Sequence, residues 1–313
     1  MKIANRKPHI SQLLIFHKFF KSMHLSSFGY RMRVAISGDD GFVAQHLAAS
    51  FGDDVVLIDT NTVEDSRLLD AALASVGCLI HLNGHPPNSN LSRDSPEAIP
   101  AMKQWAVRLA DAKNRHQGLH MVLLGSLRVH SDETFDAYTG ETSLSPRDAT
   151  AVGQLWAEER CLEHAMDTHP VSILRVSNLH GTPVDGGRGR GFLFDFARQA
   201  QSGWIAVPGD GEGIKDLIHI RDLVNIISGI AKSPPPTREA LAIGLGNTTP
   251  LRELALPIAE AYGAEIQLWA ASGDEQWGFV EANIVHQRLA WTPEVEIDEI
   301  IAEALGNVAE NLC

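Results

Sequence analysis

The sequence predicts a doubly wound α/β fold, in which helices cover both faces of a parallel sheet. From residue 32 onward, short and nearly continuous apolar segments alternate with amphipathic helical segments. That alternation is typical of strands buried on both faces of a parallel sheet. The chain has 313 residues, of which 44% are apolar and 21% charged. Such a composition is that of a globular protein with a sizeable core.

The first half of the chain shows the alternation most clearly. Strands are expected at 33–38, 54–60, 78–84 and 119–126, and helices at 42–51, 68–76, about 98–115 and 149–167. A further strand is expected within 171–181, and we predict a main sheet of about seven strands. Beyond it, helices near 192–202, 221–232, 250–262 and 296–309 lack the strict strand-and-helix rhythm.

We therefore expect three parts. Residues 32–180 form the main domain, and residues 181–313 form a smaller substrate-binding portion with strands that return to the main sheet. Residues 1–31 contain six basic side chains and no acidic one, unlike the rest of the chain. We expect this extension to be an overextended start before Met32 or a disordered segment, with a basic amphipathic arm or targeting peptide as the alternative.

Composition also narrows the partners. The net charge of −13 argues against a nucleic-acid surface, and no apolar run approaches the length of a membrane span. The three cysteines lie far apart, which indicates neither a disulfide scaffold nor a zinc site and fits a cytoplasmic protein. His81 and His85 flank the end of a strand rather than one helix face, so we expect no metal. A small-molecule ligand is the remaining expectation.

A glycine turn follows the first predicted strand. Gly38 allows the chain to turn, and Gly41 lets backbone amides approach a pyrophosphate at the start of the next helix. Asp59, at the end of the second strand, is placed to bind ribose hydroxyls and to repel a 2′-phosphate, which favours NAD over NADP. Asp39 and Asp40 in the turn work against anion binding. The expected cofactor contacts are Gly38, Gly41, Phe42, Val43, Asp59, Leu82, Asn83 and Gly84.

Six segments in order resemble the extended short-chain dehydrogenase/reductase family, in its NAD-dependent epimerase/dehydratase group. They are GDDGFVAQHL, CLIHLNG, VLLGSLRVHS, ILRVSNLHG, VPGDGEGIKDLIHIRDL and LAWTPEVEIDE, and the resemblance covers about residues 32–306. It implies an NAD-binding Rossmann domain and a nucleotide sugar or related sugar as substrate. It also implies a homodimer that pairs through the helices at about 98–115 and 149–167.

The resemblance implies roles for individual residues. Ser126 falls on the catalytic serine. Leu127 and Arg128 stand where dehydratases carry an acidic pair. The expected substrate contacts are Asn178, Lys215 in place of the usual arginine, Asp216, His219 and the nearby Arg188 and Arg190. A solvated glycine-rich loop is the alternative for the two arginines.

The family's acid/base pair, YxxxK, is missing: Thr150 and Gln154 occupy its positions. Three hypotheses follow. The protein is an enzyme that transfers a hydride transiently and uses another acid/base, for which Tyr138 and His130 are the candidates, although His130 also suits a packing role. Alternatively it binds NAD or another ligand without chemistry, as a sensor or partner subunit, or it is a scaffold without a cofactor. The intact Asp59 speaks against the scaffold.

Overall fold

The computed structural model describes residues 32–38, 41–84, 96–131, 137–163, 165–166, 168–233, 239–270 and 278–310. The chain divides into two compact units, Met1–Met32 and Arg33–Cys313. The predicted extension at 1–31, the acidic pair at 39–40 and His85 lie outside the described residues.

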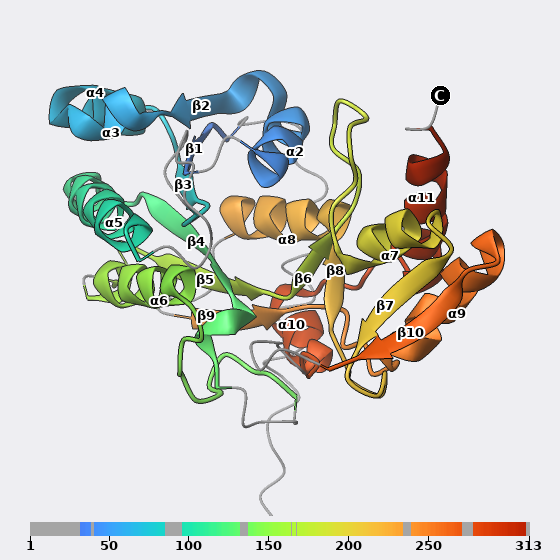
Figure 1. Ribbon diagram of the computed structural model, residues 1–313. Coiled ribbons are helices and arrows are strands. Elements are labelled where there is room, and N and C mark those ends of the chain that lie inside the picture. The colour runs from blue at the N-terminus through green and yellow to red at the C-terminus, as the bar shows by residue number, and fades with distance from the viewer. Residues whose placement is uncertain are drawn as a thin grey trace, which may run out of the picture. The chain divides into compact units, whose positions relative to one another are not determined.

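The main sheet is parallel throughout, and its strands follow the order β2-β1-β3-β4-β5-β9 (Figure 1). Their bounds are β1 Val34–Ser37, β2 Val55–Ile58, β3 Cys78–His81, β4 His120–Ser126, β5 Val171–Val176 and β9 Glu239–Ile243. Among the described residues the sheet thus has six strands, and the expectation of about seven is wrong. After β2 the chain enters helices α3 (Thr60–Glu64) and α4 (Ser66–Leu73) directly, so β2 forms the sheet edge.

Helices cover both faces of this sheet, which confirms the doubly wound fold (Figure 1). On one face α8 (Ile220–Lys232) packs on β4 and on α2 (Phe42–Phe51). On the other, α6 (Ala149–Leu162) packs on β4, β5 and α5 (Ala98–Arg115), and α5 packs on α4. Helix α6 ends at Leu162 rather than at 167, because Met166 and His169 exchange backbone hydrogen bonds in a turn that leads into β5.

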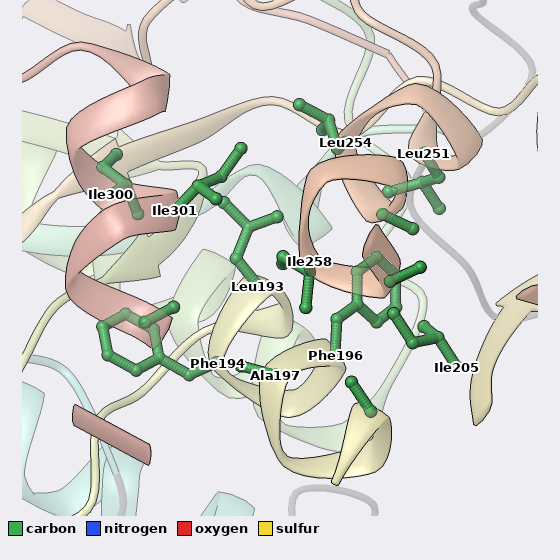
Figure 2. Close-up of a cluster of buried hydrophobic side chains, with 14 of the residues drawn as sticks. Leu193, Phe194, Phe196, Ala197, Ile205, Leu251, Leu254, Ile258, Ile300 and Ile301 are labelled. Carbon is green, nitrogen blue, oxygen red and sulfur yellow. The ribbon is translucent and has the colours of Figure 1, made fainter. Parts of the chain in front are cut away.

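The C-terminal portion has its own apolar core. Its elements are β6 Asn178–His180, α7 Phe192–Ala200, β7 Trp204–Pro208, β8 Leu217–His219, α9 Leu251–Tyr262, β10 Glu265–Trp269, α10 Ala282–Leu289 and α11 Ile297–Glu310. The first half of the chain also has two 3₁₀ turns, η2 Gly52–Asp54 and η3 Leu127–Val129. Figure 2 shows side chains of α7, α9 and α11 converging, among them Phe194, Ile258 and Ile300. Two parallel strand pairs, β6 with β8 and β7 with β10, complete this portion. None of the helices in the described ranges is long and apolar enough to cross a bilayer.

Candidate functional site

The carboxyl ends of β1, β2 and β3 meet at one edge of the sheet. β1 lies between the other two, and its last residue, Ser37, is level with Ile58 of β2 and His81 of β3. The chain continues from β1 to β2 on one side and to β3 on the other, which makes this edge the topological switch point. In open parallel sheets the crevice at such a point is the usual place for a ligand.

The glycine turn lies at this edge. Gly38 has a φ of +109°, and a Cβ there would lie 3.1 Å from the Leu82 Cβ. The turn therefore passes this close to the end of β3 because residue 38 is glycine. Gly41 precedes α2, whose N-terminus no described side chain caps and whose first turn holds no acid. The N–H groups of that turn, including those of Phe42 and Val43, have no side-chain acceptor among the described residues, and amides at a helix start are suited to an anion.

Asp59 follows β2 and is the N-cap of α3. Its Oδ1 accepts hydrogen bonds from Thr62 Oγ1 at 2.6 Å and from the Thr62 amide at 2.8 Å. These two bonds hold the pKa of the exposed carboxyl below its usual range, so it is ionised at neutral pH. Its Oδ2 has no partner among the described residues. That oxygen can accept a hydrogen bond from a ribose hydroxyl.

Asn83 joins the loop after β3 to helix α6 through Gln154. Asn83 Nδ2 donates to the Gln154 carbonyl at 3.3 Å, and Gln154 Nε2 donates to the Asn83 carbonyl at 3.2 Å. Asn83 is 1% exposed and has a φ of +48°, and its Oδ1 is buried without a partner in the described ranges. Backbone strain together with an unpaired buried acceptor is typical of a ligand site. Leu82 and Gly84 flank it.

These residues fit a dinucleotide. A turn that requires glycine, a helix N-terminus open to an anion, an ionised carboxylate and an orphaned amide oxygen share one sheet edge. The departure is on α6, where Thr150 is 8% exposed and Gln154 lies one turn further on. Gln154 already binds the Asn83 carbonyl and lacks the positive charge of a lysine. The site therefore suits cofactor binding better than proton exchange.

Ser126 ends β4. Its Oγ accepts a hydrogen bond from the Arg128 amide at 3.2 Å, which leaves the hydroxyl proton for a substrate oxygen. Arg128 donates from Nε to Asp148 Oδ2 at 2.5 Å, and Asp148 Oδ1 accepts from the Ala151 amide at 2.6 Å. The Arg128–Asp148 pair thus fixes the start of α6, including Thr150, relative to Ser126. Arg128 thus places a cation two residues after Ser126.

Tyr138 and His130, the candidate substitutes for the acid/base, are both fully buried. Tyr138 packs in a small apolar cluster, and its hydroxyl donates to the Ser131 carbonyl at 3.5 Å. His130 Nδ1 donates to the Thr142 carbonyl at 2.9 Å, and its Nε2 accepts from Arg175 Nη1 at 3.5 Å. Burial, and then the charge of Arg175, lower the pKa of His130 to about 4. Both side chains have packing roles, and their burial argues against a catalytic one.

A buried ion pair between Arg175 of β5 and Glu158 of α6 lies beside β4. Arg175 donates to Glu158 Oε2 from Nη2 at 2.8 Å and from Nε at 3.1 Å. A Cβ at Gly125 would lie 2.6 Å from Glu158 Oε1, so this glycine makes room for the carboxylate. Neither residue was a predicted site residue. The signal for both is a charge inside an apolar strand and on the inner face of the helix.

Asn178, Lys215 and Asp216 meet where β6 pairs with β8. Asn178 Nδ2 donates to the Asp216 carbonyl at 2.7 Å. The Asp216 carboxylate accepts four backbone amides, which gives it a structural role. Burial, and then the charge of Arg128, lower the pKa of the half-buried Lys215 to about 8. Lys215 and Arg128 are thus close enough to interact, and together they suit an anionic substrate group.

His219, predicted to contact substrate, has a capping role in the structure. Its Nδ1 accepts from the Arg221 amide at 3.1 Å, and its Nε2 donates to Glu303 Oε2 at 2.8 Å. Burial opposes ionisation of Glu303, but hydrogen bonds from His219 and Thr182 lower its pKa to about 2. His219 thus ties α8 to α11. Arg188 is exposed, and its side chain forms no hydrogen bond or ion pair with a described residue.

Comparison with known proteins agrees with this geometry. Residues 34–244 match the model of the NAD dependent epimerase/dehydratase family. Similar solved structures include MoeE5 in complex with UDP-glucose and NAD, with 19% identity, a TM-score of 0.73, and coverage of 90% of this chain and 100% of that one. WbmG of Bordetella bronchiseptica in complex with NAD and UDP has 15% identity and a TM-score of 0.74, with 90% and 96% covered.

A third similar structure is UDP-glucose 4-epimerase from Thermotoga maritima with UDP-glucose. It has 16% identity and a TM-score of 0.72, with 90% of this chain and 100% of that one covered. At these identities the likeness shows the fold. No curated protein sequence matches the chain.

Proposed function

The chain belongs to the NAD-dependent epimerase/dehydratase family, and on that premise we propose that it is an NAD-dependent enzyme that transfers a hydride transiently to and from a nucleotide sugar or related sugar. The observation that carries the proposal is the convergence of the Gly38 turn, the ionised Asp59 and the orphaned Asn83 Oδ1 on one sheet edge.

The chain's own residues divide the work. The N–H groups at the start of α2 hold the pyrophosphate, and Asp59 accepts from the adenosine ribose. Asn83 and Gln154 bound the opposite part of the cofactor site through their reciprocal hydrogen bonds. NAD, when bound, takes up and returns a hydride. Asp59 carries a negative charge where a 2′-phosphate would lie, so we propose NAD rather than NADP.

The substrate side follows from charge and position. The Ser126 hydroxyl donates a hydrogen bond to the oxygen at the reacting carbon, and the proton that this oxygen loses as the hydride leaves the carbon passes to solvent. Lys215 and Arg128 supply positive charge for a diphosphate, and Asn178 and Arg188 are further proposed contacts. MoeE5 and the Thermotoga maritima epimerase were each solved with UDP-glucose, which supports a nucleotide sugar as the substrate class.

A non-catalytic NAD-binding sensor or partner subunit is the second candidate. The specific observation in its favour is that Thr150 and Gln154 replace the proton-exchanging pair, and that Gln154 is engaged with Asn83. The two candidate substitutes, Tyr138 and His130, are buried. Loss of a general acid/base typically costs about 10²–10⁴-fold in rate. Slow turnover would identify the enzyme, and no turnover would identify the sensor or partner subunit.

The deciding experiment incubates the full chain with NAD and with UDP-glucose or UDP-glucuronic acid. Sugar products are separated by chromatography, and reduced cofactor is followed by absorbance. We expect slow formation of an epimer or keto-sugar that Ser126→Ala reduces while the affinity for NAD stays the same. Tight NAD binding with no product from a wider panel of nucleotide sugars would instead assign the sensor or partner role.

We also propose a cytoplasmic homodimer that pairs through α5 and α6. Val152 of α6 is 41% exposed and presents an apolar side chain for a partner. Sedimentation of the full chain and of Val152→Glu tests the pairing, since the charge should shift the species toward monomer. Identical sedimentation of both would contradict this interface.

A further inference from the structure

The segment 186–190, with the sequence GGRGR, is held by backbone hydrogen bonds. Asn307 of α11 donates from Nδ2 to the Gly187 carbonyl at 3.0 Å and accepts at Oδ1 from the Gly189 amide at 2.9 Å. Arg190 exchanges backbone hydrogen bonds with Gly181 at 2.9 and 3.2 Å. The backbone that carries both arginines is therefore fixed rather than a loosely solvated loop.

The side chain of Arg190 lies over the first residue of α2. Its Cζ is 5.3 Å from the centroid of the Phe42 ring. Phe42 is 3% exposed and directly follows Gly41 of the glycine turn. The guanidinium is exposed and forms no hydrogen bond or ion pair with a described residue. Its N–H donors therefore remain free beside the start of the helix.

A second contact holds the same loop on α2. His46 lies one turn after Phe42, and its Nε2 donates to the Thr182 carbonyl at 3.0 Å. The Thr182 amide in turn donates to Glu303 Oε1 of α11 at 2.8 Å. The rings of Phe42 and His46 are in edge contact at 5.0 Å. The loop from 181 to 190 is thus positioned on the first two turns of α2 from both of its ends.

Among the described residues the charges at this place favour an anion, and the acidic Asp39 and Asp40 of the turn lie outside that description. A cation beside the positive end of a helix is unfavourable unless a negative group lies with it. The first turn of α2 holds no acid, and no described side chain caps it. Arginine, moreover, presents a planar fork of donors that matches a phosphate.

We propose that Arg190 binds the pyrophosphate of NAD together with the amides of α2. This residue then belongs to the cofactor site although its loop comes from the C-terminal portion of the chain. The inference rests on the proposed NAD-dependent function and adds a cationic contact to it. Bound cofactor thereby holds the loop that also presents Arg188, which lies two residues earlier and forms no hydrogen bond, ion pair or ring contact with the described residues of α2.

The test compares Arg190→Ala, Arg190→Lys and Arg188→Ala with the unaltered full chain. Each is titrated calorimetrically with NAD, with ADP, which carries a diphosphate, and with adenosine, which carries none. We expect Arg190→Ala to weaken the binding of NAD and of ADP by about tenfold or more, which corresponds to the loss of one or two charge-assisted hydrogen bonds. Adenosine affinity should not change. Arg190→Lys should fall between, and Arg188→Ala should match the unaltered chain in cofactor affinity.

The outcomes separate this inference from the proposed function. If the unaltered chain binds NAD and Arg190→Ala binds it equally well, the inference is overturned and the proposed function stands. If Arg188→Ala weakens NAD binding as much as Arg190→Ala does, the effect comes from the overall positive charge of the loop, and the inference is again overturned. If the unaltered chain binds neither NAD nor ADP, both fail. Thermal unfolding by circular dichroism establishes that each variant is folded.

Discussion

Acidification should destabilise this protein steeply, because four fully or almost fully buried histidines are held neutral. Burial is the main cause that lowers the pKa of each to about 4. The residues are His81, His120, His130 and His180, and each is 2% exposed or less. Two of the rings accept a hydrogen bond that needs the neutral form: His180 Nε2 accepts from the Leu193 amide at 3.3 Å, and His130 Nε2 accepts from Arg175 Nη1 at 3.5 Å.

The sign follows from proton linkage. The unfolded chain binds protons near pH 6.5 and the folded chain only near pH 4, so stability is complete above about pH 6.5 and falls as the pH is lowered. At about pH 5.5 each histidine has cost roughly 1.4 kcal/mol. Asp216 acts in the opposite direction, since burial raises its pKa to about 6, but it returns less than about 1 kcal/mol. The net loss is about 5 kcal/mol, a large part of a domain's stability.

Urea unfolding followed by circular dichroism measures this loss at about pH 7.5, 6.5 and 5.5 and constant ionic strength. His120→Gln should remove about a quarter of the pH dependence of the unfolding free energy, because His120 is one of the four buried histidines. In the unaltered chain His120 Nε2 is bound to Ser172 Oγ, away from the proposed cofactor site. Equal unfolding free energies at about pH 7.5 and 5.5 would refute the reasoning that these rings are neutral in the folded state.

Three further predictions concern single residues. Glu158→Gln leaves the buried Arg175 without its counter-ion and should cost about 3–5 kcal/mol in urea unfolding, whereas a loss under about 1 kcal/mol would contradict a buried pair. Gly38→Ala places a Cβ 3.1 Å from Leu82 Cβ and should weaken NAD binding. Gly186→Ala, also at positive φ but with nothing within 4 Å of the added Cβ, should leave NAD binding unchanged, and equal effects of the two substitutions would exclude the crowding argument. Ser126→Ala should lower kcat by about 10²–10³-fold without changing the NAD affinity, and an unchanged kcat would remove Ser126 from the proposed mechanism.

The sequence predicted the main sheet well, because each of its strands is an apolar run that can be recognised from the local sequence alone. It predicted the helix near 68–76 but not α3, which Asp59 caps directly after β2. It also did not identify β10 or α10. Four of the five residues of β10 are exposed, and the strand exists through pairing with β7 about 60 residues earlier in the chain. Local apolar pattern carries no signal for such a strand.

The site divides in the same way. The glycine turn and Asp59 depend on short spacing and were predictable, whereas the partners of the histidines were not. His219 binds Glu303, 84 residues away, and Arg175 reaches His130, 45 residues away. These contacts give His219 and His130, which were predicted as a substrate contact and a candidate acid/base, structural roles instead. Arg190 likewise becomes a candidate for the cofactor site only through its contact with Phe42, 148 positions earlier in the sequence.

The most direct test of the account is a calorimetric titration of the full chain with NAD and with NADP. The central claim is that the edge formed by the Gly38 turn and Asp59 is an NAD site even though Thr150 and Gln154 replace the acid/base pair. We expect NAD to bind and NADP to bind about tenfold more weakly or worse, with Asp59→Asn narrowing the difference. The absence of NAD binding at millimolar concentration, or tighter binding of NADP, would contradict the claim.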